Sequence, residues 1–338
     1  FSARDLPVPK DRRQGFDYWK GREVTHNYNN SFYFDENDVK HTWEGYDVFP
    51  QTDSAISYIQ KNKENPFVLM LSYGPPHAPY FSAPKEYQNM YDASTLEVRP
   101  NVPLAYQDSA RKVLAGYYAH STAIDFAIAG IADNTILVFT SEHGDMLMSK
   151  GVLKKQRPYD EAIKVPMLVR YPAKLGIKSR HVIDPIGTID LLPTLLGLSD
   201  IASPESIEGK DFSGELLAGK DLGNEAALIM LPVPFHEWKF SNGGREFRGI
   251  RTKRYTYVKD LKGPWLLYDN EKDPYQENNL ANDPDVKDLQ NQLEGVLMKK
   301  LEATGDTFLP ADEYMTRYNY LYDAQDSLRK VNYLELGR

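Results

Sequence analysis

The sequence predicts an α/β fold in which a large, mostly parallel central sheet is flanked by helices, with a smaller subdomain at the C-terminus. Short apolar runs of strand length alternate with segments of helical periodicity, and histidine-bearing loops follow two of these runs. After about residue 228 the pattern changes to short segments split by turn residues, which is typical of an antiparallel sheet. We therefore expect two domains, residues 1–227 and residues 228–338.

The first elements follow from periodicity and from turn residues. Residues 1–50 are polar and aromatic without a clear period, which predicts loops or a short hairpin. Thr52-Asp53-Ser54 is a candidate cap for a helix that runs to about Lys63, because Asn65-Pro66 stops it. Residues 67–72 form a continuous apolar run, which predicts a strand buried on both faces.

The remaining elements of the first domain repeat this alternation. We expect a helix over about residues 107–129, a second buried strand over 135–140, a third strand over 165–170 and a short helix from 189 to 196. The connection between the long helix and the strand at residue 135 is unusually short. Two parallel strands need a crossover connection of about a dozen residues or more. Either residues are missing near 126–132, or the chain is a shortened relative without catalytic activity.

The second domain is expected to contain a helix packed on antiparallel strands. Candidate strands cover residues 246–252, 255–259 and 265–269. A helix is expected over about residues 284–304, with an apolar face formed by Leu289, Leu293, Val296, Leu297 and Leu301. The polar tail, residues 305–338, is expected to wrap the surface.

Composition excludes several classes of function. The 338 residues carry a net charge of −8 with scattered lysines and arginines, which argues against nucleic acid as a partner. No apolar stretch approaches the roughly 20 residues of a membrane span. The chain has no cysteine, so its own residues supply no disulfide, thiolate nucleophile or Cys-ligated zinc. The 23 tyrosines suit sugar binding, although aromatic cores are the commoner explanation.

Four residues after the predicted strands have side chains suited to chemistry. Glu142 and His143 can both face a hard cation, and Gly144 lets the backbone approach closely. His77, held between prolines, can protonate a leaving group or bind an anion. Lys155 can place an ammonium against a sulfate or phosphate oxygen. Each residue taken alone is more commonly structural: a strand end, a core histidine or a charged turn.

The order and spacing of these residues resemble the sulfatase family. Residues 73–80, YGPPHAPY, are similar to the family's PHxPY loop, and residues 134–145, NTILVFTSEHGD, resemble its NTxxxFTSDHG strand. Residues 155–166 are similar to its KxxxYEExxRVP element. Residues 248–252 and 267–280 resemble its C-terminal RxxRT and LYDLxxDPxExxNL signature. The resemblance runs from about residue 14 to about residue 300.

This resemblance implies an alkaline-phosphatase-like fold and a set of roles. Glu142 and His143 fall on a pair that helps to bind one divalent cation, usually Ca²⁺, with Mg²⁺ or Mn²⁺ as alternatives. Glu142 replaces the usual Asp and so moves the carboxylate by about a bond length. His77 and Lys155 match residues that contact the sulfate group, and His77 is a candidate acid for the leaving alkoxide.

The chain departs from the family pattern at the nucleophile. The family's Asp-Asp metal pair and its Cys/Ser-x-Pro-x-Arg element, whose first residue becomes formylglycine, are not found in the 338 residues. Ser82-Ala83-Pro84-Lys85 lacks the Arg and lies after the His77 loop, so we reject it. We expect residues 1–338 to form one wall of a sulfatase site and to release no sulfate by themselves.

The resemblance implies a sulfuric ester hydrolase that acts on a sulfated carbohydrate by a metal-assisted formylglycine mechanism. Two alternatives remain: a phosphonate or phosphodiester hydrolase of the same superfamily, and a non-catalytic relative that binds sulfated glycans. A bacterial periplasmic or secreted location is favoured, because the lack of cysteine argues mildly against a lysosomal protein. The sequence predicts no oligomeric state.

Overall fold

The computed structural model describes residues 6–22, 25–128 and 135–318. The chain forms two compact units. Of the described residues, the N-terminal unit contains 6–22, 25–128 and 147–151, and the C-terminal unit contains 135–146 and 152–318. Each unit has a buried core of its own. The domain boundary that the sequence predicts at residue 228 stays a prediction.

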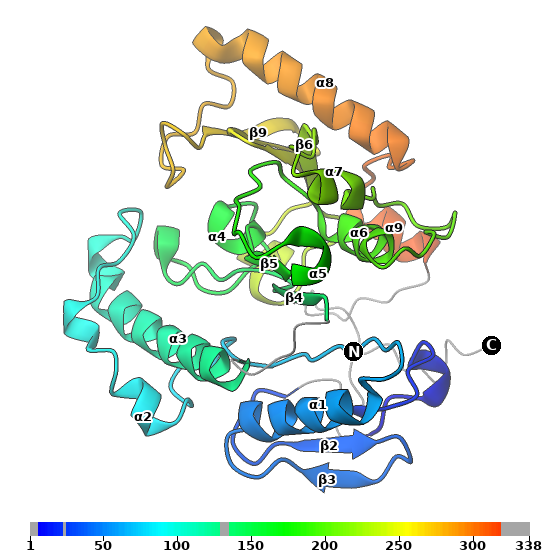
Figure 1. Ribbon diagram of the computed structural model, residues 1–338. Coiled ribbons are helices and arrows are strands. Elements are labelled where there is room, and N and C mark those ends of the chain that lie inside the picture. The colour runs from blue at the N-terminus through cyan, green and yellow to red at the C-terminus, as the bar shows by residue number, and fades with distance from the viewer. Residues whose placement is uncertain (1–5, 23–24, 129–134, 319–338) are drawn as a thin grey trace. The chain divides into compact units, whose positions relative to one another are not determined.

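A small antiparallel sheet and two long helices dominate the N-terminal unit. The strands are β1 (Lys20–Gly21), β2 (Phe32–Asp35) and β3 (Lys40–Thr42), so the expected hairpin is present. The helices are α1 (Val48–Asn62), α2 (Lys85–Gln88) and α3 (Gln107–Ile128), and short 3-10 turns cover Lys10–Arg12, Ala93–Thr95, Leu104–Tyr106 and Ser149–Gly151. Figure 1 shows α1 lying along the β2–β3 hairpin.

Both long helices confirm the predictions, although α1 begins earlier than expected. Thr52 was a candidate cap, but it lies within the helix, where its hydroxyl donates to the Val48 carbonyl at 2.7 Å. Helix α1 and helix α3 contribute to one buried cluster, which contains Tyr28, Tyr46, Val48, Ala123 and Ile124. This cluster is the core of the N-terminal unit.

The predicted strand over residues 67–72 is wrong. The segment is not part of a sheet, and Val68 and Met70 are 80% and 74% exposed. An apolar run becomes a buried strand only where a neighbouring strand supplies hydrogen bonds and helices cover its faces. No strand of the described residues pairs with this run.

Two predicted strands of the C-terminal unit are present but differ in their pairing. β4 (Leu137–Thr140) and β5 (Met167–Arg170) form an antiparallel pair in which Val138 lies opposite Val169. Neither strand is fully buried, and Leu168 is 64% exposed. Every strand pair in the described part of the chain is antiparallel, so the expected parallel pairing is not found there.

Helix α4 (Asp160–Ile163) lies between β4 and β5. The helices α5 (Pro172–Leu175), α6 (Leu191–Leu198) and α7 (Ser213–Ala218), with a 3-10 turn at Thr188–Asp190, connect this pair to the second sheet, and two further 3-10 turns at His236–Trp238 and Phe240–Asn242 follow its first strand. The predicted helix from residue 189 is therefore confirmed. The short return before residue 134 lies outside the described residues and stays a prediction.

A four-stranded antiparallel sheet follows, in the order β6 (Ala226–Leu231), β7 (Phe247–Thr252), β8 (Tyr255–Asp260) and β9 (Gly263–Asp269). The last three strands were predicted. β6 was missed because its apolar residues do not alternate with polar ones, so it lacks the period of a half-buried strand. The sheet is packed on both faces, since Tyr257 and Val258 belong to different buried clusters.

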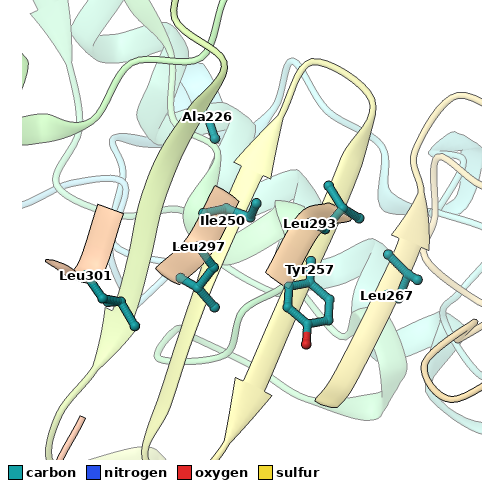
Figure 2. Close-up of a cluster of buried hydrophobic side chains, with 7 residues drawn as sticks. All are labelled: Ala226, Ile250, Tyr257, Leu267, Leu293, Leu297 and Leu301. Carbon is teal, nitrogen blue, oxygen red and sulfur yellow. The ribbon is translucent and has the colours of Figure 1, made fainter. Parts of the chain in front are cut away.

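Helix α8 (Lys287–Ala303), preceded by a 3-10 turn at Pro284–Val286, covers one face of this sheet. Figure 2 shows Leu293, Leu297 and Leu301 of α8 against the sheet residues Ile250, Tyr257 and Leu267. The predicted apolar face is confirmed, because Leu289 and Val296 pack against the same cluster.

The segment after α8 corrects the expectation of a surface tail. It contains α9 (Ala311–Arg317), in which Ala311 and Met315 are buried. The Arg248 guanidinium, 1% exposed, pairs with Asp306 and donates to the Tyr314 hydroxyl at 2.9 Å. Residues 319–338 lie outside the described part. Within the described residues, no helix is both long and apolar enough to cross a membrane.

Candidate active site

Hydrogen bonds of backbone amides bring the Glu142-His143 loop and the Lys155 segment together in the C-terminal unit. The Gly144 amide donates to the Ala162 carbonyl at 2.8 Å. The Lys154 amide donates to Asp145 Oδ1 at 2.9 Å, and the Lys154 carbonyl accepts from the Met146 amide at 2.7 Å. The two motifs therefore form one structural element, as the order of the motifs predicts.

Gly144 is required for this contact. A Cβ at this position would lie 2.0 Å from the carbonyl oxygen of Glu161, a distance that no side chain tolerates. The sequence suggested that Gly144 allows a close backbone approach, and the structure shows that the approaching group is helix α4. The glycine thus fixes the position of the preceding Glu142-His143 pair.

The candidate metal ligands contact each other. His143 Nε2 lies 3.2 Å from Glu142 Oε1, and His143 Nδ1 lies 2.7 Å from the Gly144 carbonyl, to which it can donate. A backbone contact at Nδ1 orients the ring and leaves Nε2 directed at the carboxylate and at any cation beside it. The Glu142 side chain is 86% exposed, so its oxygens are accessible.

A divalent cation fits this donor set in part. A carboxylate and an imidazole are two ligands, whereas calcium takes six to eight, mostly oxygens. Among the described residues, no group of three or more histidine, aspartate or glutamate side chains is arranged to hold a metal ion. The pair therefore qualifies as part of a coordination shell.

Lys155 lies between two residues with unusual backbone conformations. Lys154 and Gln156 have φ values of 66° and 75°, in the left-handed region that non-glycine residues rarely adopt. Both are held from outside: Lys154 Nζ pairs with Glu237 at 3.0 Å, and Gln156 Oε1 accepts from the Trp238 amide at 3.2 Å. Backbone strain of this kind persists where surrounding contacts enforce it, commonly at functional sites.

The segment that follows Lys155 is attached to the C-terminal sheet. Arg251 of β7 forms two parallel hydrogen bonds to the Asp160 carboxylate, at 2.8 and 2.9 Å. The Asp160 amide also donates to Gln276 Oε1 at 2.9 Å. Because a bidentate arginine–carboxylate pair restricts orientation as well as distance, the sheet fixes α4 at the end of the Lys155 segment.

The His77 loop belongs to the N-terminal unit and is held from several sides. The Tyr28 hydroxyl lies 3.0 Å from the His77 carbonyl and 3.1 Å from the Ala78 carbonyl, and it donates to this pair of oxygens. The His77 ring reaches back through Nδ1 to the Ala78 carbonyl at 2.8 Å. The imidazole is therefore oriented by its own loop.

His120 of α3 is a second support for this loop that the sequence did not predict. The Tyr46 hydroxyl lies 2.5 Å from His120 Nδ1, and His120 Nε2 lies 3.2 Å from the Pro79 carbonyl. Burial lowers the pKa of His120 to about 4, so the ring is neutral at pH 7 and carries its proton on Nε2, where it donates to Pro79.

His26 is the other residue that the sequence did not predict. Its ring stacks on His77 with centroids 4.9 Å apart and planes only 9° from parallel. His26 lies in a polar loop far from His77 in the sequence, and no sequence pattern predicts a contact between the two rings. The stacked pair places two imidazoles side by side at the candidate acid.

The four predicted site residues thus divide between the two units. Glu142, His143 and Lys155 lie in the C-terminal unit, in segments joined by hydrogen bonds. His77 lies in the N-terminal unit. Their catalytic and metal-binding roles stay predictions.

Comparisons with known proteins match almost the whole chain. The family model described as Sulfatase matches residues 5–201, and the model described as N-sulphoglucosamine sulphohydrolase, C-terminal, matches residues 149–303. The ulvan-active sulfatase of Formosa agariphila is 42% identical over 338 residues, which cover 94% of this chain and 65% of that protein. The endo-4-O-sulfatase of Bacteroides thetaiotaomicron is 28% identical over 342 residues, a match that covers 88% of this chain and 65% of that protein.

A similar solved structure comes from a Bacteroides thetaiotaomicron locus for the metabolism of multiple glycosaminoglycans. It has a TM-score of 0.78 at 26% identity and covers 92% of this chain and 69% of that chain. The similarity confirms the predicted α/β, alkaline-phosphatase-like fold class with its C-terminal antiparallel sheet. The chain spans just under two thirds of the length of the two curated relatives named above.

Proposed function

The chain belongs to the sulfatase family, and we propose that it forms part of a site that hydrolyses a sulfate ester on a carbohydrate. In this proposal Lys155 neutralises charge on a sulfate oxygen, and His77 donates a proton to the leaving alkoxide. Both roles address charge that develops during S–O cleavage, where a fixed cation and a positioned acid are most effective.

One observation carries the proposal. The Glu142-His143 loop and the Lys155 segment are joined by three hydrogen bonds, so a cation at the first and an ammonium at the second lie in one structural element. A sulfate group has several anionic oxygens and can contact both positive groups at once. Rigid support of this kind is what electrostatic stabilisation requires.

The proposal includes a divalent cation and a formylglycine nucleophile. Ca²⁺ is the proposed cation, with Glu142 and His143 among its ligands. When present, the formylglycine supplies the group that attacks sulfur, and the cation offsets charge on the sulfate oxygens. Because the chain has no cysteine, no residue among the 338 yields a formylglycine by the cysteine route.

The proposed substrate is a sulfated polysaccharide or oligosaccharide. Two relatives support this class by name, one as an ulvan-active sulfatase and the other as an endo-4-O-sulfatase. Both come from bacteria, and polysaccharides are too large to cross a membrane unaided, so we place the protein in the periplasm or outside the cell.

Lys155→Ala in the full-length protein tests the function. Removing one stabiliser of a developing oxyanion lowers kcat by about 10²–10³-fold in enzymes of known mechanism, and we expect a loss of that order in sulfate release. Lys178→Ala, a lysine on an exposed surface loop of the same unit, is the matched control and should keep wild-type activity. Released sulfate is measured by ion chromatography from ulvan oligosaccharides.

The same assay separates the alternatives. Wild-type release of phosphonate or phosphodiester products in preference to sulfate would identify a different hydrolase. Binding of sulfated oligosaccharides without any turnover would identify a non-catalytic relative. Full activity of the Lys155→Ala protein would exclude the proposed role of Lys155.

A further inference from the structure

The N-terminal unit contains a second candidate binding site, and no residue of the His77 loop lines it. An open cavity of about 510 Å³ lies between the end of the β1 hairpin and the exposed side of α1. Its lining contains Tyr18, Lys20 and Trp43 together with residues of α1. The volume is within the usual range for small-ligand pockets, about 300–1,000 Å³.

Part of the cavity lining is aromatic. The Tyr18 and Tyr58 rings lie 4.9 Å apart at an angle of 33°. Trp43 is 9% exposed and stacked on Tyr33 with centroids 4.0 Å apart, so it backs this lining and presents little area itself. The partly exposed Tyr18 and Tyr58 rings are the ones that offer apolar area with little loss of conformational freedom on binding. The apolar face of a sugar ring matches such a wall.

The same wall presents a lysine. Lys20 Nζ lies 2.8 Å from Ser54 Oγ and 5.4–5.6 Å from the ring centroids of Tyr18, Tyr33 and Trp43. The Tyr18 hydroxyl lies 2.8 Å from the same Ser54 oxygen. The ammonium is therefore positioned by a hydroxyl and three rings at the surface of the cavity.

The charges of the lining favour an anion. Two lysines, Lys20 and Lys61, face one carboxylate, that of Asp53, in a chain whose net charge is −8. A local excess of positive charge in an acidic chain is selective for an anionic group. Ser57 and Asn62 add hydrogen-bonding groups that can reach sugar hydroxyls.

We propose that this cavity, which we call the Lys20 pocket, is an accessory site for a sulfated sugar unit of the polysaccharide. The sugar ring packs against the exposed parts of Tyr18 and Tyr58, and Lys20 and Lys61 bind its sulfate group. The proposal rests on the proposed function for its choice of ligand. An accessory site raises the affinity for a polymer, because binding there keeps further units of the same chain at high local concentration.

The test measures binding of ulvan to the full-length protein by affinity electrophoresis, in the presence of a chelator to suppress turnover. Lys20→Ala and Lys61→Ala should each weaken binding about tenfold, the loss expected for one charge-assisted hydrogen bond. Lys40→Ala, a lysine on β3 of the same hairpin, is the matched control and should bind ulvan like the wild type. Thermal unfolding of each variant identifies any loss that arises from misfolding.

Chemically desulfated ulvan distinguishes a sulfate site from a uronate site. We expect the difference between wild type and Lys20→Ala to vanish with the desulfated polymer. An unchanged difference would overturn the assignment to sulfate, and wild-type affinity of both lysine variants for ulvan would overturn the site itself. Hydrolysis of 4-nitrophenyl sulfate by the wild type, which needs no polymer, tests the proposed function separately.

Discussion

The buried carboxyl group of Asp47 makes the stability of the fold depend on pH. Its side chain is 2% exposed and accepts a hydrogen bond from the Ser31 hydroxyl at 2.7 Å. Burial disfavours the charged carboxylate and raises the pKa of Asp47 to about 6, although the Ser31 bond lowers it. The carboxyl group therefore binds a proton more tightly in the folded chain than in the unfolded one.

Asp47→Asn should become more stable relative to the wild type as the pH rises. A folded pKa above the unfolded value of about 4 means that the wild type loses stability between about pH 4 and pH 6. A shift of about two units corresponds to about 3 kcal/mol, fully expressed above about pH 6. Urea unfolding of both proteins between about pH 4 and pH 7 measures the difference.

His120 contributes a slope of the opposite sign in the same range. Its folded pKa is lowered to about 4, so its contribution to stability is lost as the pH falls from about 6.5. Both proteins contain His120, so its contribution cancels in the comparison. Asp53→Asn, at an exposed position of helix α1, which begins directly after Asp47, is the matched control. A constant difference between Asp47→Asn and wild type would contradict the buried charge.

Helix α8 shows which elements the sequence can predict. Its apolar residues recur at helical spacing, and every one of them packs against the C-terminal sheet. Here local pattern and tertiary packing agree, so the pattern is sufficient. The segment 67–72 is the opposite case, because an apolar run becomes a strand only if another part of the chain pairs with it.

Leu297→Ala tests the contribution of the α8 face. The side chain is fully buried, and truncation of a buried leucine costs about 2–5 kcal/mol through lost burial and a residual cavity. The thermal midpoint should fall by several degrees in calorimetry. Met298→Ala, whose side chain is 48% exposed on the same helix, should change it little. Equal effects of the two changes would contradict the packing.

The candidate site was predictable only in part, because a local pattern does not determine which distant segments of the chain come into contact. Glu142, His143 and Lys155 lie in motifs whose order reflects a shared backbone arrangement, and hydrogen bonds do join their segments. His26 and His120 contact the His77 loop from distant positions in the chain. Only the packing of α3 and of the residue 25–30 loop creates these contacts, so no local pattern indicates them.

At the scale of the whole chain, the C-terminal sheet supports the candidate site. The two family matches overlap over residues 149–201, the stretch that contains Lys155 and Asp160. Within the C-terminal unit, Arg251 joins that stretch to β7 through an ion pair whose side chains are only 15% and 12% exposed. The sheet therefore has a structural link to the segment that carries the proposed sulfate contact.

Arg251→Met tests whether the Arg251–Asp160 pair affects activity as well as stability. Breaking a largely buried pair leaves the Asp160 charge uncompensated, which costs about 3 kcal/mol. Because α4 then loses its orientation, we expect kcat for sulfate release to fall about tenfold or more, as small misplacements do in other enzymes. Arg251→Lys, which keeps the charge but loses the bidentate geometry, should recover part of the activity.

Arg254→Met is the matched control for this experiment. Arg254, in the turn between β7 and β8, forms a similar two-bond pair with Asp269 at the end of β9, at 2.8 and 2.6 Å, and this pair does not include Asp160. Its loss should lower stability and leave kcat close to the wild-type value, both measured on the full-length protein below its unfolding temperature. If both methionine variants lost activity in proportion to stability, the sheet would contribute only to folding. A fall in kcat confined to Arg251→Met would show that the sheet also positions the Lys155 segment.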